Sequence, residues 1–403
     1  MPILQVLRWL PLVAAAGTAG PILYLCILSF SAILTTKKRK VEDMPTSTRI
    51  NFAILIPAHN EEIILGTLLE SLSALGYPKN LYTVYVVADN CTDRTAELAR
   101  ATGWVHVYER FDQTRRGKGY ALTWLLQKLE EGQSIYDAYV VLDADSVVEP
   151  AFLQLMAREL ARGARALQAR YTVLNTVESP STALRWIALT LVNHVRPLGR
   201  SGLGASSTLT GNGMCLSHSL LKRYPWQSSA LAEDYQYYLR LIQNGERVCY
   251  LPEAVVRAEM PTTFAQMRTQ DVRWESSESD EKKWPFALRL LVTGLKHRDF
   301  VRIEAVAELL TPPLSILVSS CLLTLLVSLL LWSPAPALLS LLLLCGLTCY
   351  IGTALYLLRP PRAVYMALLH APGFMIWKLW VYFVLSRSAK QTSEWIRTSR
   401  VSH

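Results

Sequence analysis

The chain has 403 residues, of which 51% are hydrophobic and 18% charged, and its formal net charge is +9. It is too apolar for an ordinary soluble enzyme and too polar for a protein buried wholly in a membrane. The basic excess suits an anionic membrane surface, and the absence of a basic stripe interleaved with aromatic residues argues against nucleic-acid binding. The seven cysteines form no C-x-x-C pair, which argues against structural zinc.

The first predicted element is an apolar run over residues 9–34 that stops at the basic cluster Lys37–Lys40. A secretory signal is the alternative, because an arginine precedes the run and three alanines lie within it. The run continues well past those alanines, and a long span with a basic stop is typical of an uncleaved anchor. We therefore expect a transmembrane anchor over residues 1–36, followed by a cytoplasmic domain over residues 45–300.

Strand-like and helix-like segments alternate through the first half of this domain. Alternation at this spacing predicts a parallel, doubly wound α/β sheet. Asn60 is expected to cap the first helix, because its side-chain oxygen can accept a bond from the first turn. The expected strands cover residues 52–56, 82–88, 104–108 and 139–142, and the expected helices cover residues 61–75, 92–101 and 120–129.

Polar residues follow the carboxyl ends of these strands, which is where open α/β sheets bind ligands. Pro57 and Glu61 flank the end of the first strand, and Asp89 ends the second. The fourth strand is followed by Asp143 and Asp145, a D-x-D pattern that can hold a divalent cation and, through it, a diphosphate. Each of these residues could alone be a capping acid or part of a solvated turn. Together on one edge of the sheet they predict a nucleotide site.

A basic loop and two later motifs complete the set. The loop 116–119 combines glycines with Lys118 at the start of a helix, which suits a diphosphate, although a solvated loop can have this composition. Glu233 and Asp234 begin a predicted helix, where they could also be a capping pair. A Q-x-x-R-W motif follows, whose tryptophan could equally be a core residue. It consists of Gln270, Arg273 and Trp274.

In this order, the motifs resemble those of the membrane-bound family-2 glycosyltransferases, in particular bacterial processive polysaccharide synthases of the cellulose, hyaluronan, chitin and poly-N-acetylglucosamine type. The resemblance covers about residues 50–285 and the flanking apolar segments. It implies a GT-A-type, Rossmann-like nucleotide-sugar domain with a mostly parallel sheet, together with transmembrane and interfacial helices. The matching motifs are P-A-H-N-E (57–61), A-D-N-C-T-D (88–93), G-K-G (117–119), D-A-D (143–145), G-N-G (211–213), E-D (233–234) and Q-x-x-R-W (270–274).

The resemblance also implies roles for individual residues. Asp145 would coordinate Mg²⁺ or Mn²⁺ bridging the donor diphosphate, and Asp234 would be the general base on the acceptor hydroxyl. Family members invert the anomeric centre. The nucleotide sugar, expected to be a UDP-sugar, would be held by Pro57, Glu61, Asp89, Lys118 and Asp143, and donor and acceptor would be gated by Glu233, Gln270, Arg273 and Trp274.

Two positions depart from the pattern of this family. Ala88 stands where many members have a second aspartate, and Asp271 makes the region around the Q-x-x-R-W motif more acidic than expected. Neither departure removes a catalytic role. Both leave the donor and the acceptor less well determined.

Residues 181–197 have the pattern of an amphipathic helix. Such a helix could face the core, or it could lie against the membrane surface or the acceptor path, and residues 284–296 raise the same alternatives. The apolar face of the first segment consists of Leu184, Ile187, Ala188, Leu191 and Val195, with Arg185 and Arg196 elsewhere on the helix.

Three apolar stretches follow the domain. Residues 311–332 and 337–358 are each long enough to cross a bilayer as a helix, and the short uncharged loop between them suits the outside. The third stretch, residues 363–385, contains Ala371-Pro372-Gly373 at its middle. A full third span would place the basic tail, residues 386–403, outside. We therefore expect an interfacial or re-entrant helix there and a cytoplasmic tail.

Together, these expectations describe a multi-pass enzyme of the inner (plasma) membrane with a cytoplasmic catalytic domain. It would transfer a hexose or N-acetylhexosamine from a UDP-sugar to a growing polysaccharide, with room for a homo-oligomer or an export partner. Transfer of a single sugar to a membrane lipid is the alternative, and a non-catalytic or transport subunit is a third. The few spans argue against a solitary transporter, and the carboxylates at 143, 145 and 234 argue against an inactive scaffold.

Overall fold

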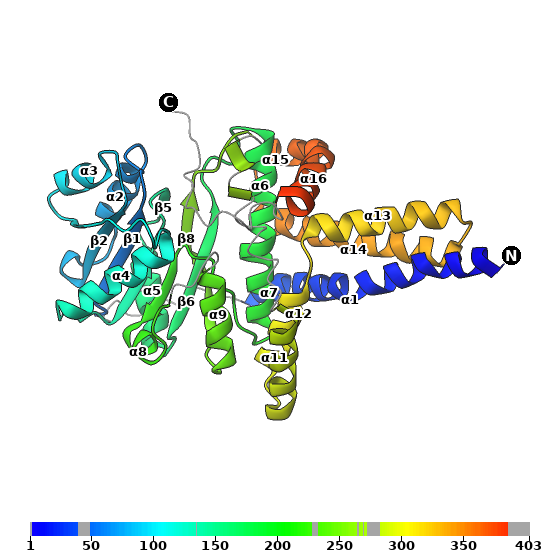
Figure 1. Ribbon diagram of the computed structural model, residues 1–403, viewed down its shortest axis with the longest axis horizontal. Coiled ribbons are helices and arrows are strands. Elements are labelled where there is room, and N and C mark those ends of the chain that lie inside the picture. Colours follow the sequence, from blue (N-terminus) through cyan, green and yellow to red (C-terminus); the bar gives the residue numbers. More distant parts are fainter. Residues whose placement is uncertain are drawn as a thin grey trace.

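The computed structural model of the chain has two parts that meet at a layer of helices (Figure 1). An α/β domain lies at one end, and three long helices project from the other side of the layer. Between them, α6 (Pro180–Thr190) and α7 (Arg196–Gly202) run across the base of the projecting helices. The structure describes residues 2–38, 49–133, 135–227, 233–263, 266–268, 270–271 and 283–385.

An eight-stranded sheet forms the α/β domain, in the order β3-β2-β1-β4-β7-β6-β8-β5. The first four strands are mutually parallel, as the alternating pattern predicts, whereas β7 runs antiparallel to both of its neighbours. The predicted α/β class with a mostly parallel sheet is confirmed. The strands are β1 (Phe52–Ala58), β2 (Tyr82–Asp89), β3 (His106–Arg110), β4 (Ala138–Val141), β5 (Ser146–Val148), β6 (Ala166–Val173), β7 (Met214–Ser217) and β8 (Val248–Ala258).

Helices cover both faces of the sheet, and each face has its own apolar core. Successive side chains of β1 point to opposite faces, so Ile54 and Ile56 pack in the core with α2, whereas Ala53 and Leu55 pack in the core with α4. Burial on both faces explains why β1 is apolar at every position. The helices are α2 (Leu65–Ser73), α3 (Thr95–Ala101), α4 (Lys118–Glu131), α5 (Phe152–Ala161), α8 (His218–Arg223) and α9 (Glu233–Gln243), with a 3₁₀ turn at Lys79–Leu81.

The prediction that Asn60 caps the first helix is wrong. Its backbone has a positive φ of 56°, and α2 begins only at Leu65. The Asn60 side-chain oxygen instead accepts a hydrogen bond from the Thr92 N–H at 2.8 Å. The loop after β1 is therefore tied to the loop after β2, and this contact between neighbouring strand ends is what local helix-capping rules cannot anticipate.

Three long apolar helices pack against one another beyond α6 and α7: α1 (Pro2–Lys38), α13 (Leu314–Leu330) and α14 (Pro334–Leu358). Among the described residues, three helical segments are long and apolar enough to cross a membrane: most of α1, all of α14, and the segment Arg362–Phe383. A fourth is obtained if α12 (Phe300–Leu310) and α13, which meet at a 63° bend, count as one span.

The predicted amphipathic helix at 181–197 is a core element. It consists of α6, a wider π-helical turn (Leu191–Val195) and the start of α7, and its apolar face packs against α1 and α14. The arginines expected away from this face, Arg185 and Arg196, are also buried. They pair with buried acids, Asp271 and Glu308.

The apolar stretch 363–385 is helical with one irregular turn, and its part Arg362–Phe383 is long and apolar enough to span a membrane, so its expected interfacial or re-entrant placement stays a prediction. The stretch forms α15 (Arg362–Ala367), a 3₁₀ turn (Leu368–His370), α16 (Ala371–Trp380) and a last turn (Val381–Leu385). Pro372 lies in the first turn of α16, where its missing N–H costs no helical hydrogen bond, so the irregular turn falls just before it. Both α15 and α16 contact α6 at the base of the three long helices, across from α11 (Lys283–His297) and α12 (Figure 1).

Candidate active site

The carboxyl ends of β1, β2 and β4 bring the predicted nucleotide residues to one edge of the sheet. Pro57 lies near the end of β1 and is in register with Val87 of β2. Asp89 is the last residue of β2, and Asp143 follows β4 by two residues. Glu61 is fixed to the same edge, because its N–H donates to Thr95 Oγ1 at 2.8 Å. The four positions therefore gather as parallel strand ends require.

Asp89 is fully buried at this edge. Its Oδ1 accepts hydrogen bonds from Arg110 at 2.5 Å and from the Asn90 amide at 3.1 Å, while its Oδ2 makes no well-formed hydrogen bond among the described residues, although the Gly117 N–H approaches the carboxylate. Burial raises the pKa of Asp89, and the Arg110 guanidinium opposes this. A buried carboxylate oxygen without a well-formed hydrogen bond is costly, so Oδ2 is suited to accept an N–H from a bound ligand.

Lys118, the first residue of α4, is a cation that interacts with three acidic residues of the site, Asp143, Glu233 and Asp234. Its Nζ donates to Asp143 Oδ1 at 2.5 Å and to the Gly211 carbonyl at 2.6 Å. Burial alone lowers the pKa of Lys118, but Asp143, Glu233 and Asp234 outweigh burial and raise it. Lys118 therefore stays cationic and joins the D-x-D turn to the loop that contains Gly211.

Asp234 lies on the other side of that loop, at the start of α9. Gly211 has a positive φ of 73°, and a Cβ added there would come within 2.8 Å of Asp234 Oδ2 and 3.2 Å of Lys118 Nζ. Glycine thus suits the backbone conformation, and a side chain there would displace the Asp234 carboxylate. The neighbouring Asn212 accepts from the Asp143 N–H at 3.2 Å and so holds the loop against the D-x-D turn.

The two acids at the start of α9 hold their protons more tightly than usual. Burial and the charge of Asp234 raise the pKa of Glu233 to about 7. Burial likewise raises the pKa of Asp234, against the opposing charge of Lys118. A carboxylate with a raised pKa is a better proton acceptor near neutral pH than an ordinary surface aspartate.

The expected metal ligand, Asp145, lies on the turn between β4 and β5 and is partly buried. No group of three or more histidine, cysteine or acidic side chains suited to a metal occurs in the described part of the chain. Mg²⁺ in nucleotide sites is commonly held by one or two carboxylates together with substrate phosphates. A single carboxylate such as that of Asp145 is enough for a metal held in this way, and Asp143, two residues earlier, is paired with Lys118.

The expected gating residues are only partly described. Gln270 is buried beside Asp271, and no hydrogen bond joins it to Lys118 or Asp234 within the described ranges. Arg273 and Trp274 lie outside the described residues.

Sequence reasoning assigned no role to Arg110. The third strand was expected to end at Tyr108, but it continues to Arg110, whose guanidinium bonds Asp89 and also Asp112 and the Arg115 carbonyl. The sequence offered one signal for this role: Arg110 is a basic residue two positions after the expected end of the strand at Tyr108. Asn212 was part of a recognised motif, but its bond to Asp143 could not be foreseen.

With this geometry established, comparison with known proteins identifies the family. The sequence pattern described as glycosyltransferase-like family 2 matches residues 49–277. The chain belongs to this family. It is 26% identical over 230 residues to the probable glycosyltransferase YdaM of Bacillus subtilis, and the matched region covers 55% of this chain and 54% of that protein.

A second relative is the beta-monoglucosyldiacylglycerol synthase of Nostoc sp., 29% identical over 228 residues, or 55% of this chain and 47% of that protein. The chain thus spans about half the length of the curated relatives it matches. The solved structure of the mannosyltransferase PcManGT from Pyrobaculum calidifontis is similar over 94% of this chain and 99% of that chain, with a TM-score of 0.54 at 16% identity. At that identity the likeness shows a shared fold, which confirms the GT-A type for this family-2 glycosyltransferase.

Proposed function

We propose that this family-2 glycosyltransferase transfers one sugar from a nucleotide sugar to the hydroxyl of a membrane lipid. The packing of the three long helices carries the choice of acceptor. Each of α1, α13 and α14 contacts the other two, and three helices at ordinary packing distance enclose no channel. A lipid acceptor needs no channel through the protein, because it reaches the site along the membrane surface.

A growing polysaccharide is the second candidate acceptor. It is supported by the Q-x-x-R-W motif at 270–274, which is one of the motifs that resemble those of polysaccharide synthases. Because the three long helices of the described part of the chain pack against one another, export of the product would require a homo-oligomer or a separate export partner. The two candidates therefore differ in product length and in the need for a partner.

For the donor, we propose that Asp89 and Lys118 bind opposite ends of the nucleotide. The Asp89 Oδ2 would accept the ring N–H of uracil, with Pro57 and Glu61 beside it. Guanine offers a similar N–H, and PcManGT was solved with GDP-mannose and Mn²⁺, so both nucleotide types belong in the test. Lys118 would offset the negative charge of the diphosphate as it leaves. When bound, a divalent metal held by Asp145 would further stabilise that leaving group.

For the transfer step, we propose Asp234 as the general base. The acceptor hydroxyl attacks the anomeric carbon from the face opposite the diphosphate. The new C–O bond forms while the bond to the diphosphate breaks, the acceptor proton moves to Asp234, and the nucleoside diphosphate departs. One displacement of this kind inverts the anomeric centre and needs only one base. Glu233 adjoins Asp234 and would line the acceptor side of the site.

We also propose that the enzyme is a multi-pass protein of the inner (plasma) membrane with its catalytic domain in the cytoplasm. The bundle of α1, α13 and α14 would span, and α15 and α16 would lie in the cytoplasmic interface. Support comes from the basic end of α1 at Lys37 and Lys38, which lies on the catalytic side, while the N-terminus and the turn between α13 and α14 lie at the far end of the bundle (Figure 1).

Purified protein in nanodiscs tests this proposal. UDP-glucose, UDP-galactose, UDP-N-acetylglucosamine and GDP-mannose are supplied in turn with Mn²⁺, with and without diacylglycerol or ceramide, and nucleoside diphosphate release is measured. The expected result is release from one donor that rises with one added lipid and is lost in the Asp234→Asn variant. No release from any donor under these conditions contradicts the proposal.

A further inference from the structure

Asp271 is fully buried at the centre of a charged cluster outside the proposed transfer site. Its Oδ1 accepts hydrogen bonds from Arg185 of α6 and, at 3.0 Å, from Lys378 of α16. Its Oδ2 accepts a bond from the Trp377 indole N–H at 3.0 Å. One carboxylate thus links the segment that contains Gln270 to two other elements, α6 and α16.

The cluster is ionised and nearly free of solvent. Burial alone raises the pKa of Asp271, but Arg185, Lys378 and Trp377 together lower it below its usual value. The Arg185 side chain is 2% exposed and that of Lys378 is 13% exposed. Removing one partner from such a cluster is strongly unfavourable, because it leaves an uncompensated buried charge. The position of residues 270–271 is therefore fixed to the position of α16.

A second contact joins the same two elements. The Arg268 guanidinium lies 6.0 Å from the centre of the Trp380 ring, within the range of a cation–π interaction. Arg268 precedes Gln270 by two residues, and Trp380 follows Lys378 by two residues on α16. Arg268 and Asp271 thus hold the chain to α16 on both sides of Gln270.

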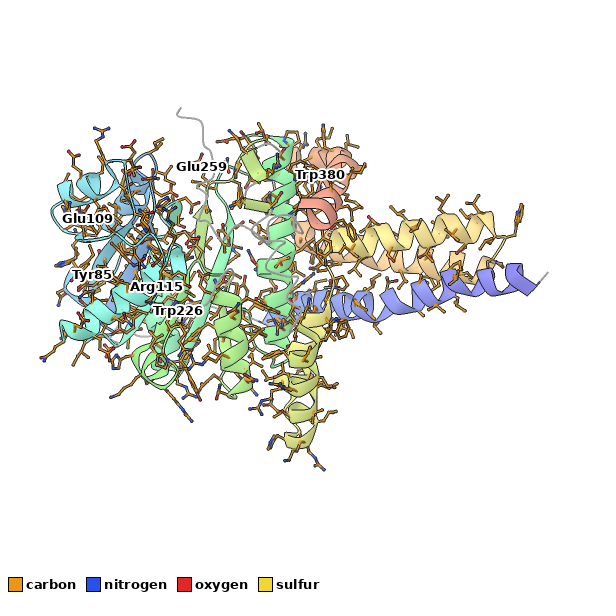
Figure 2. All side chains as sticks on the ribbon, in the orientation of Figure 1. Tyr85, Glu109, Arg115, Trp226, Glu259 and Trp380 are labelled. Carbon is orange, nitrogen blue, oxygen red and sulfur yellow. The ribbon has the colours of Figure 1, made fainter. Side chains whose placement is uncertain are left out.

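The segment formed by α15, α16 and the turns next to them also has apolar side chains that are exposed. Figure 2 shows Trp380 on the C-terminal helices at the base of the long helices, on the side from which the bundle projects. A bilayer around that bundle would cover the exposed parts of these side chains. They are Met366 (62% exposed), Leu369 (74%), Ile376 (69%), Trp380 (40%) and Phe383 (48%).

We infer that α16 is a positioning element, which holds the Gln270 segment in place through Asp271 and Arg268 when a bilayer covers its apolar face. Membrane contact and the geometry of the segment are thereby coupled through Lys378 and Trp377. The donor-gating role of this segment is what the family resemblance implies, and it rests on the proposed function. The coupling itself concerns the structure of the segment and can be measured without any turnover.

Hydrogen exchange in nanodiscs tests the coupling directly. Lys378→Met removes one cation from Asp271 and keeps most of the length of the side chain, with Lys222→Met on the exposed surface of α8 as its matched control. Exchange in the peptide covering residues 266–271 should accelerate about tenfold in Lys378→Met, with the sheet unaffected. The control should match the parent. Unchanged exchange in Lys378→Met overturns the inference.

The contribution of the bilayer is tested from the other face of the helix. Ile376→Asp places a charge on the lipid-facing side, and Ile135→Asp places one at a site that is 77% exposed on the α/β domain. Faster exchange at residues 266–271 is expected in the first variant alone. If Ile376→Asp leaves exchange there unchanged, the bilayer does not hold α16 and the inference as stated is wrong.

Two further measurements separate a positioning role from simple stabilisation. Asp271→Asn leaves Arg185 and Lys378 without their carboxylate, so Asp271→Asn/Lys378→Met should exchange more slowly at residues 266–271 than Asp271→Asn alone. In the active enzyme, Lys378→Met should raise the KM for donor about tenfold while kcat changes much less than KM, a split that loss of folded protein would not produce. Asp234→Asn should be inactive with normal exchange. An inactive parent with the expected exchange response would count against the proposed function and leave the coupling intact.

Discussion

The acid pair at the start of α9 makes a quantitative prediction about stability. The Glu233 carboxyl has its pKa raised from 4.5 to about 7 in the folded protein. The folded state therefore binds more protons than the unfolded state between these values, and stability falls as pH rises through this range. At ~1.4 kcal/mol per tenfold change in the ionisation constant, the full effect is on the order of 3 kcal/mol. Solvent screening of the partly exposed carboxylate reduces it to about 2 kcal/mol.

Glu233→Gln removes the ionisation and should therefore stabilise the protein at high pH. At pH 8 the variant should melt roughly 5 °C above the parent, since about 1 kcal/mol shifts a domain of this size by roughly 2–4 °C. At pH 4.5 the two should melt together. Thermal unfolding of detergent-purified protein at the two pH values measures this, with Glu97→Gln on the exposed surface of α3 as control. An unchanged or lower melting temperature for Glu233→Gln at pH 8 would refute the reasoning.

Three further predictions follow from the site and the bundle. Asp145→Asn should abolish metal-stimulated transfer without lowering the melting temperature, and near-normal turnover with Mg²⁺ or Mn²⁺ would remove Asp145 as the ligand. Gly211→Ala should cost about 1–2 kcal/mol of stability because of the positive φ at this position. It should also lower kcat at least about tenfold by displacing Asp234, and a normal kcat would contradict the close approach of residue 211 to the Asp234 carboxylate. In a cysteine-depleted background, an impermeant thiol reagent should label Trp332→Cys at the tip of α13–α14 in intact cells and not Lys222→Cys, and labelling of Lys222→Cys would reverse the orientation.

The parallel half of the sheet could be predicted because its signal is local. Each strand is a short apolar run with polar residues at its end, and a helical pattern follows within the next few residues. The antiparallel strand β7 could not be predicted in the same way. Met214–Ser217 pairs with strands that begin at Ala138 and Ala166, far away in the sequence, and no local pattern specifies such partners.

The same distinction applies to the charged residues. Asp143 and Lys118 could be chosen as candidates from their places at a strand end and a helix start, and the structure joins them directly. Arg185 could not be placed, because its burial depends on Asp271, 86 residues away in the sequence. Helical periodicity alone puts an arginine on a polar face. A buried ion pair reverses this, and only the tertiary structure reveals the partner.

The mass of the product shows whether a single sugar is added to a membrane lipid. Nanodiscs containing the enzyme are incubated with the donor identified by nucleotide release, and the lipids are extracted and analysed by mass spectrometry over increasing times. We expect a lipid heavier by a single sugar residue, with no longer species as donor is consumed, and no product from Asp234→Asn. A ladder of products that lengthens with time would contradict this expectation and identify the chain as a polymerase.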